Sequence, residues 1–306
     1  MPEAETALAV AAMTHPGQKR ERNEDAYGYV HTPYGGVFVV ADGMGGHAHG
    51  DRAARMAVET IIERLKDRDP SPALLAEAVE EANRRIYQAA KGSRAEGMGT
   101  TVTALVVDFP YALVAHVGDS RAYLFRNGLL VQLTQDHSWV ADRVREGLLR
   151  PEDARGHRWK NIITNALGTF PEVEVDLLGF KLKPGDLLLL STDGLHGVLG
   201  EEAIARVLSG EPNLNEAVRR LVELANAWGG PDNITALAVQ ANEVPENGEK
   251  PYALAFASDQ PVYIRARSGE PELVLPKPPP RYRFTEVVLL LLWLGLLAYV
   301  LFHPRG

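Results

Sequence analysis

The chain has 306 residues, of which 45% are hydrophobic, so it is long enough for one or two domains and for a substantial buried core. Lysine and arginine total 32 against 40 aspartate and glutamate residues, and the formal net charge of −8 argues against a nucleic acid as the main partner. The chain has no cysteine, which excludes disulfides, cysteine-ligated zinc, iron–sulfur clusters and thiolate nucleophiles. Any bound metal must therefore be held by oxygen or imidazole ligands.

Residues 1–240 alternate between short β-branched or aliphatic runs, which predict strands, and longer segments with apolar residues at helical spacing. In chain order the predicted elements are a strand at 37–41, helices at 54–65 and 72–86, strands at 101–107, 112–117, 121–125 and 187–191, a helix at 214–228 and a strand at 234–239. Several neighbouring strands are joined by loops too short for a crossover helix. The sheets are therefore expected to be mainly antiparallel.

An aspartate stands at the end of an apolar strand, or directly before one, four times in residues 1–240. Asp42 ends VFVVAD, Asp119 follows ALVAHVG, Asp193 follows LLLLST, and Asp232 lies just before ITALAV. Each alone is typical of a turn. Strand ends on one edge of a sheet converge, however, and four carboxylates there would repel one another unless a cation neutralised them. Oxygen ligands suit Mg²⁺ or Mn²⁺, and two such ions can activate a water for in-line attack on a phosphoryl group.

The charged run KRERNED at 19–25 is typical of a solvated turn when it is considered alone. A phosphorylated substrate, however, needs a cation beside an acidic metal site, and a planar guanidinium can hold two phosphate oxygens at once. Arg20 and Arg22 are both candidates on this ground. Gly43, directly after Asp42, has no side chain and would let its carbonyl turn toward a metal.

Seven motifs carry a resemblance to a known family. They are Arg20-x-x-Asn23-Glu24-Asp25, Val39-Val40-Ala41-Asp42-Gly43-Met44-Gly45-Gly46, Gly99-Thr100-Thr101, Val117-Gly118-Asp119-Ser120-Arg121, Leu133-Thr134-x-Asp136-His137-Ser138, Ser191-Thr192-Asp193-Gly194 and Asp232-Asn233-Ile234-Thr235. In this order, over about residues 8–240, they resemble the metal-dependent protein Ser/Thr phosphatases, the PPM or type 2C family. The resemblance implies hydrolysis of phosphoserine and phosphothreonine, and an α/β (α+β) fold in which two antiparallel sheets are stacked between helices as a four-layer αββα sandwich.

The resemblance also implies a role for each matching aspartate and for Gly43. Asp42 would bridge two Mn²⁺ or Mg²⁺ ions, the Gly43 carbonyl would bind one of them, and Asp193 and Asp232 would bind the other. Asp119, together with Asp193, would hold a weaker third ion.

Four further positions follow from the resemblance. Arg20, rather than Arg22, stands where the family places its phosphate-binding arginine, and Glu24 and Asp25 would hold metal-bound waters. Where some members have a histidine after Asp-Gly, thought to protonate the leaving group, this chain has Met44.

The identity of the general acid is therefore left open. The role of residues 139–168, which follow the fifth motif, is left open as well. His47, His49 or a metal-bound water could protonate the leaving group. Residues 139–168 resemble the mobile flap of bacterial members, yet their helical spacing describes a surface helix equally well.

The composition changes after residue 240. The segment 241–280 holds 8 of the 20 prolines, which predicts a domain at 1–240 followed by a proline-rich linker at 241–283. Residues 287–302 are sixteen consecutive apolar residues, so a transmembrane helix is predicted at 284–303, with a buried core helix as the alternative.

The chain is therefore expected to be a single-pass protein of the cell membrane. The N-terminus has no basic region typical of a secretory signal, and Arg281 and Arg283 precede the apolar run while Arg305 alone follows it, which predicts a cytoplasmic catalytic domain. The expected partners are phosphorylated proteins, and the resemblance to membrane-anchored bacterial members of the family implies that a Ser/Thr protein kinase and its targets are among them. No nucleic acid is expected, and the chain is expected to be monomeric.

Two other functions compete with the phosphatase. Gly43-x-Gly45-x-x-Ala48, with Glu63 about twenty residues on, fits a dinucleotide-binding fingerprint, although that function leaves the other aspartates unexplained. The second is a catalytically weak module of the same fold that binds phosphoproteins at the membrane.

Overall fold

The computed structural model describes residues 7–45, 49–92, 95, 97–154, 156–246, 250, 261–267 and 270–272. By its contacts the chain divides into residues 1–274 and 275–306. The predicted transmembrane helix at 284–303 falls in the second unit, which lies outside the described residues. Within the described ranges, no helix combines the length and apolar character needed to cross a membrane.

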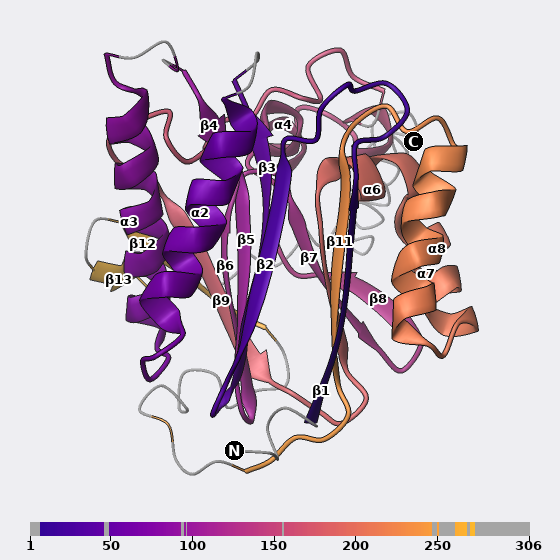
Figure 1. The fold of residues 1–306 in the computed structure, drawn as a ribbon. Coiled ribbons are helices and arrows are strands. Elements are labelled where there is room, and N and C mark those ends of the chain that lie inside the picture. The colour runs from indigo at the N-terminus through magenta and orange to yellow at the C-terminus, as the bar shows by residue number, and fades with distance from the viewer. Residues whose placement is uncertain are drawn as a thin grey trace, which may run out of the picture. The chain divides into compact units, whose positions relative to one another are not determined.

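Within the described residues the larger sheet has eight strands, and every paired neighbour in it is antiparallel (Figure 1). Seven strands lie in the order β13-β12-β9-β6-β5-β3-β2, and the short β4 pairs with β3. Their bounds are β2 Asp25–Thr32, β3 Gly35–Met44, β4 Gly99–Thr100, β5 Val102–Asp108, β6 Tyr111–Val117, β9 Val175–Lys181, β12 Val262–Arg267 and β13 Glu270–Glu272.

The smaller sheet has five strands in the order β1-β11-β10-β7-β8, again all antiparallel. Their bounds are β1 Leu8–His15, β7 Arg121–Arg126, β8 Leu129–Gln132, β10 Leu187–Ser191 and β11 Ile234–Ala241.

Helices cover the outer face of each sheet (Figure 1). The helices are α2 Gly50–Leu65, α3 Pro72–Ala90, α4 Trp139–Arg145, α5 Pro151–Ala154, α6 Asp193–Leu199, α7 Glu201–Gly210 and α8 Leu214–Ala227. The helices α2 and α3 pack on the eight-stranded sheet, whereas α6, α7 and α8 pack on the five-stranded one. The mixed α/β fold with two antiparallel sheets and flanking helices is thus confirmed.

The two-residue period of β3 shows how one strand serves two cores. Val37 and Val39 pack against α2 and α3, while Phe38 and Val40 pack in the core between the sheets. Because successive side chains of a strand point to opposite faces, a strand buried on both faces is a continuous apolar run. The predicted strand at 37–41 is therefore part of β3.

The segment predicted as a linker at 241–283 contains two strands, β12 and β13, in its described part. Val262 is paired with Gly179 of β9, and the Tyr263 hydroxyl donates a 3.0 Å hydrogen bond to the Leu133 carbonyl. The run Val262-Tyr263-Ile264 has the β-branched and aromatic residues typical of a strand, and the surrounding prolines concealed it. The compact part of the chain thus extends past residue 240.

Candidate metal centre

The four predicted aspartates come from both sheets, at the end of the sandwich where α4 and α6 lie (Figure 1). Asp42 lies near the end of β3 and Asp119 two residues after β6, both in the eight-stranded sheet. Asp193 begins α6 directly after β10, and Asp232 lies two residues before β11, both in the five-stranded sheet. The expectation that one sheet edge supplies all four is therefore wrong, because the stacked edges of two sheets share them.

Asp42 is held in place through its backbone. Thr101 donates its N–H to the Asp42 carbonyl at 2.9 Å and accepts the Asp42 N–H on its hydroxyl at 3.0 Å. The Thr100 hydroxyl donates to the same carbonyl at 2.9 Å. The backbone at Asp42 is therefore fixed independently of any ligand that the side chain binds.

Gly43 is required by close packing. A Cβ atom at this position would lie 2.2 Å from the carbonyl oxygen of Gly50, in the first turn of α2. Only glycine lets α2 begin so close to β3. The role of the Gly43 carbonyl as a metal ligand stays a prediction.

A similar close contact brings Asp193 and Asp232 together across the five-stranded sheet. A Cβ atom on Gly194 would lie 2.0 Å from the carbonyl oxygen of Asn233. The first turn of α6, which begins with Asp193, therefore lies directly against the loop that carries Asp232.

Asp25 lies beside this contact, at the start of β2. One of its oxygens, Oδ2, accepts hydrogen bonds from the hydroxyls of Thr192, at 2.8 Å, and Thr235, at 2.6 Å. Among the described residues its other oxygen, Oδ1, has no hydrogen-bond partner, and neither has Oδ1 of Asp193. Two buried carboxylate oxygens are thus available to a cation or to its waters.

Burial and mutual repulsion disfavour full ionisation of this cluster. Burial raises the pKa of Asp42 well above its ordinary value, and the charges of Asp25 and Asp193 add to the effect. Burial likewise raises the pKa of Asp119, with a further contribution from Asp193. Burial and the charge of Asp232 raise the pKa of Asp193 to about 6, although a hydrogen bond with Asp42 opposes them.

The cluster therefore fits a hard divalent cation, which would permit all the carboxylates to ionise. In the described residues, no group of three or more acidic or histidine side chains is placed to hold a metal ion by itself. Magnesium and manganese sites commonly retain several water ligands, so an open set of carboxylates of this kind suits them.

Arg20 lies at the rim of the cluster. Its Nη2 atom is 2.8 Å from Oδ2 of Asp232, and this hydrogen bond raises the pKa of the guanidinium. The Arg20 side chain remains 52% exposed, so it is open to a ligand. Arg22 is exposed, and it is Arg20 that lines the adjoining cavity, which favours Arg20 as the phosphate-binding residue.

Asn233 fastens the turn that carries Arg20 to the loop that carries Asp232. Its side-chain amide donates to the carbonyls of Pro16, at 2.9 Å, and Arg22, at 2.8 Å, and its Oδ1 accepts the N–H of Glu24 at 2.8 Å. The side chain of Asn233 thus connects both ends of the Arg20 turn, and it places the Glu24 backbone beside the centre.

The Asn233→Ala variant is expected to lower the free energy of unfolding by about 3 kcal/mol, because it removes three hydrogen bonds at a residue that is only 5% exposed. Urea denaturation measures this change. The matched control is Asn226→Ala, which removes a single 3.4 Å hydrogen bond from Gln18 and should cost less than about 1 kcal/mol. Equal losses in the two variants would show that Asn233 has no special role in holding the turn.

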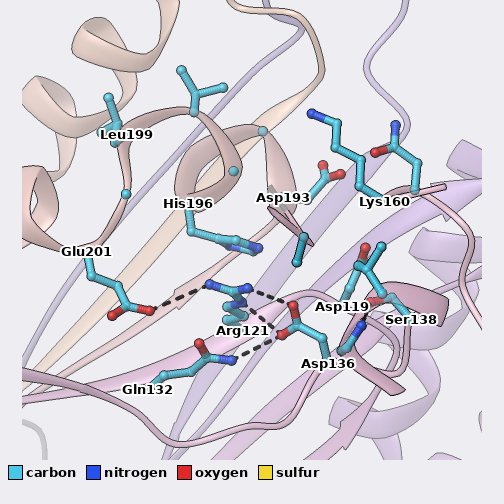
Figure 2. Close-up of a pocket in the computed structure, with 18 of the residues that line it drawn as sticks. Asp119, Arg121, Gln132, Asp136, Ser138, Lys160, Asp193, His196, Leu199 and Glu201 are labelled. Carbon is cyan, nitrogen blue, oxygen red and sulfur yellow. Dashed lines mark hydrogen bonds and ion pairs between the residues drawn. The ribbon is translucent and has the colours of Figure 1, made fainter. Parts of the chain in front are cut away.

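A cavity of about 910 Å³ opens beside the cluster. Arg20, Asp119, Asp193 and Asp232 line one end of it, and Figure 2 shows Asp119 and Asp193 on either side of that end. Residues of α4 and α5 form another wall, so the predicted flap at 139–168 borders the site. Lys160, whose charge lowers the pKa of Asp193, also lines the cavity, and no motif in the sequence pointed to it.

Two histidines near Met44 are candidate general acids. His47 lies outside the described residues, and His49 is the half-buried N-cap residue of α2. The assignment of the general acid to His49, His47 or a metal-bound water therefore stays a prediction.

Comparison with known proteins gives consistent matches over this part of the chain. A sequence model of the family described as Protein phosphatase 2C matches residues 15–235. The serine/threonine phosphatase stp of Listeria innocua is 37% identical over 237 residues, which are 75% of this chain and 94% of that protein.

Solved structures show the same similarity. The serine/threonine phosphatase PstP/Ppp of Mycobacterium tuberculosis superposes with a TM-score of 0.71 at 36% identity, over 77% of this chain and 99% of that one. A structure of the PstP catalytic domain in complex with two manganese ions has a TM-score of 0.68 at 36% identity, over 76% of this chain and 97% of that one.

Proposed function

The chain belongs to the protein phosphatase 2C family and is a serine/threonine protein phosphatase, and on that premise we propose that the four-aspartate cluster is its catalytic centre. The observation that carries this assignment is the convergence of carboxylates at one end of the sandwich. The pKa values of Asp42, Asp119 and Asp193 are raised, and one oxygen each of Asp193 and the neighbouring Asp25 lacks a hydrogen-bond partner among the described residues. When bound there, two Mn²⁺ or Mg²⁺ ions would activate the attacking water and neutralise charge on the phosphoryl group.

In this proposal the aspartates hold the metals. Asp42, whose backbone is held by Thr100 and Thr101, would be shared between two ions, Asp193 and Asp232 would bind one of them, and the Gly43 carbonyl would bind the other. Asp119, which lies near Asp193 in Figure 2, would contribute with Asp193 to a weaker third ion.

The neighbouring residues position water and substrate. Asp25 has a buried oxygen without a hydrogen-bond partner in the described part of the chain, and Asp25 and Glu24 would hold metal-bound water. The Arg20 guanidinium binds the phosphate and can exchange its contact with Asp232 for the substrate oxygens.

Hydrolysis of a phosphothreonine peptide by the full chain is expected to require added Mn²⁺ or Mg²⁺ and to stop when EDTA is added. The carboxylates supply metal sites but no nucleophile of their own, so activity should return when excess Mn²⁺ is restored. Phosphate release measures both steps. Undiminished hydrolysis in EDTA would contradict the proposed centre.

Arg20→Ala is expected to raise KM for a phosphothreonine peptide about tenfold and to change kcat much less, because a phosphate clamp acts largely in substrate binding. Steady-state kinetics at saturating Mn²⁺ provide the measurement. Arg22→Ala is the control, since that side chain is exposed, and it should leave both constants unchanged. A tenfold loss of kcat at constant KM would show that Arg20 has a different role.

The two competing functions are less well supported. A dinucleotide-binding site needs a parallel βαβ unit, whereas β3, which precedes the Gly43-x-Gly45 motif, is antiparallel to its neighbours. A catalytically weak binding module has little need for a costly cluster of buried carboxylates.

We also propose that residues 284–303 anchor the phosphatase in the cell membrane, with its catalytic domain in the cytoplasm. The sixteen apolar residues at 287–302 and the excess of arginine before them support this proposal. The substrates would be phosphoproteins at that membrane, including a Ser/Thr protein kinase and its targets.

A further inference from the structure

The cavity continues beyond the metal centre. Figure 2 shows it passing from Asp119 and Asp193, across Arg121, to Leu199 and Glu201 at the opposite end. Its volume of about 910 Å³ is in the range of cavities that enclose drug-sized molecules, so a phosphorylated side chain leaves much of it free. We call the end of the cavity that is lined by Arg121, Gln132, Asp136, Leu199 and Glu201 the distal half.

The floor of the distal half is polar, but its charges cancel. Arg121 and Asp136 form two parallel hydrogen bonds, Nε to Oδ1 at 2.8 Å and Nη2 to Oδ2 at 2.7 Å. Gln132 donates a further 3.1 Å hydrogen bond to Oδ1 of Asp136. Arg145, on the wall formed by α4, is paired with Asp142.

Glu201 differs from these paired groups. Its nearest ion-pair partner in the described part of the chain is Arg121, at 3.8 Å, and that guanidinium is already occupied by Asp136. The Glu201 side chain is 44% exposed and stands at the first residue of α7, where the helix dipole favours an ionised carboxylate. The distal half therefore carries one negative charge that its own cations do not fully neutralise.

The walls of the distal half are partly apolar. Leu199, at the end of α6, and Val144, on α4, both line the cavity. A ligand with an aliphatic stem and a cationic head matches apolar walls that lead to a carboxylate, because the stem stays in apolar contact while the head remains near water.

We propose that the distal half is a subsite for a lysine or arginine side chain of the phosphorylated polypeptide, with Glu201 as the residue that determines this specificity. The proposal rests on the catalytic site proposed above, because the same cavity joins both places and one substrate chain can occupy both. The substrates so favoured are phosphoproteins with a basic residue near the phosphorylated one.

The experiment compares phosphothreonine peptides in which one position at a time carries lysine, norleucine or glutamate. With the unmodified full chain and Mn²⁺, lysine at one position should raise kcat/KM about threefold to fivefold over norleucine, as expected of one partly exposed ion pair. The preference should weaken in high salt. Glu201→Gln should abolish it, and Glu201→Lys should transfer it to the glutamate peptide.

Glu202→Gln is the matched control, because Glu202 is the next residue of α7, is exposed and does not line the cavity. This variant should retain the full preference for lysine. Hydrolysis of p-nitrophenyl phosphate, which is too small to reach the distal half, should be unchanged in every variant.

Three outcomes would overturn the subsite. These are equal kcat/KM for lysine and norleucine at every position in the unmodified chain, an unchanged preference in Glu201→Gln, and a parallel loss of p-nitrophenyl phosphate hydrolysis in the Glu201 variants. Failure of the proposed catalytic centre would look different, because no phosphoester would then depend on Mn²⁺ for its hydrolysis.

Discussion

Asp42→Asn is expected to lower kcat on a phosphothreonine peptide by about a thousandfold, because the amide replaces the one carboxylate proposed to be shared by both metals. The substitution keeps the shape of the side chain, and the hydrogen bonds from Thr100 and Thr101 hold the backbone of residue 42 in place. The loss should therefore be chemical, without a local change of fold. Phosphate release at several Mn²⁺ concentrations measures it.

The same variant should be more stable than the unmodified chain when no metal is present. The folded-state pKa of Asp42 is raised above its ordinary value of 3.8 because of burial and the neighbouring carboxylates. A carboxyl group with a raised pKa opposes folding as the pH rises above its unfolded value, so its removal is stabilising at neutral pH. In EDTA at pH 7 the Tm of Asp42→Asn should exceed that of the unmodified chain, and added Mn²⁺ should reverse the order.

The Asp119→Asn variant tests whether Asp119, unlike Asp42, binds only the weaker third ion. If Asp119 serves only a third ion, a Mn²⁺ titration of this variant should lose its weakest step and keep its tightest. Loss of the tight sites in Asp119→Asn, or their retention in Asp42→Asn, would mean that the two aspartates have been assigned in the wrong order.

Local patterns were sufficient to predict those strands that are buried on both faces. The runs at 37–41, 101–107 and 187–191 are mostly apolar because each strand contributes alternate side chains to the core between the sheets and to the core beneath the helices. The strand β2 has a more polar sequence, DAYGYVHT, and lies at an edge of its sheet, so it has no comparable signal.

The helix α6 could not be predicted from propensity. Its sequence, DGLHGVL, contains two glycines, and Asp193-Gly194 alone is typical of a turn. The helix forms because Leu195 and Leu199 are buried in the core beneath the five-stranded sheet. Tertiary packing thus overrides the local preference, and it places Asp193 at the beginning of a helix.

The candidate site was predicted as a set of residues but not as a geometry. The motifs in the sequence identify Asp42, Asp119, Asp193 and Asp232, yet their arrangement depends on how two sheets stack, which is a property of distant pairings. The cavity beside them depends on the same stacking and on α4. For that reason the role proposed for Glu201 has no counterpart in a local pattern.

The full chain is expected to sediment with membranes and to resist extraction by high salt, whereas a chain shortened to residues 1–272 should remain in the supernatant and retain peptide phosphatase activity. Each leucine, valine or phenylalanine at the centre of a membrane helix favours insertion by about 0.3–0.6 kcal/mol, so the sixteen apolar residues at 287–302 sum to a stable anchor. The shortened chain must retain β12 and β13, because both strands belong to the eight-stranded sheet.

A matched control keeps the length of the chain and changes only its affinity for lipid. Replacing Leu291 and Leu294 by arginine places two charges near the middle of the apolar run, at a cost of about 2.5–3.5 kcal/mol each, which is enough to cancel insertion. This variant should leave the membrane fraction as the shortened chain does. If the full chain were instead soluble without detergent and the shortened chain aggregated, residues 287–302 would be a helix of the protein core, because their removal would then expose an apolar surface that they cover.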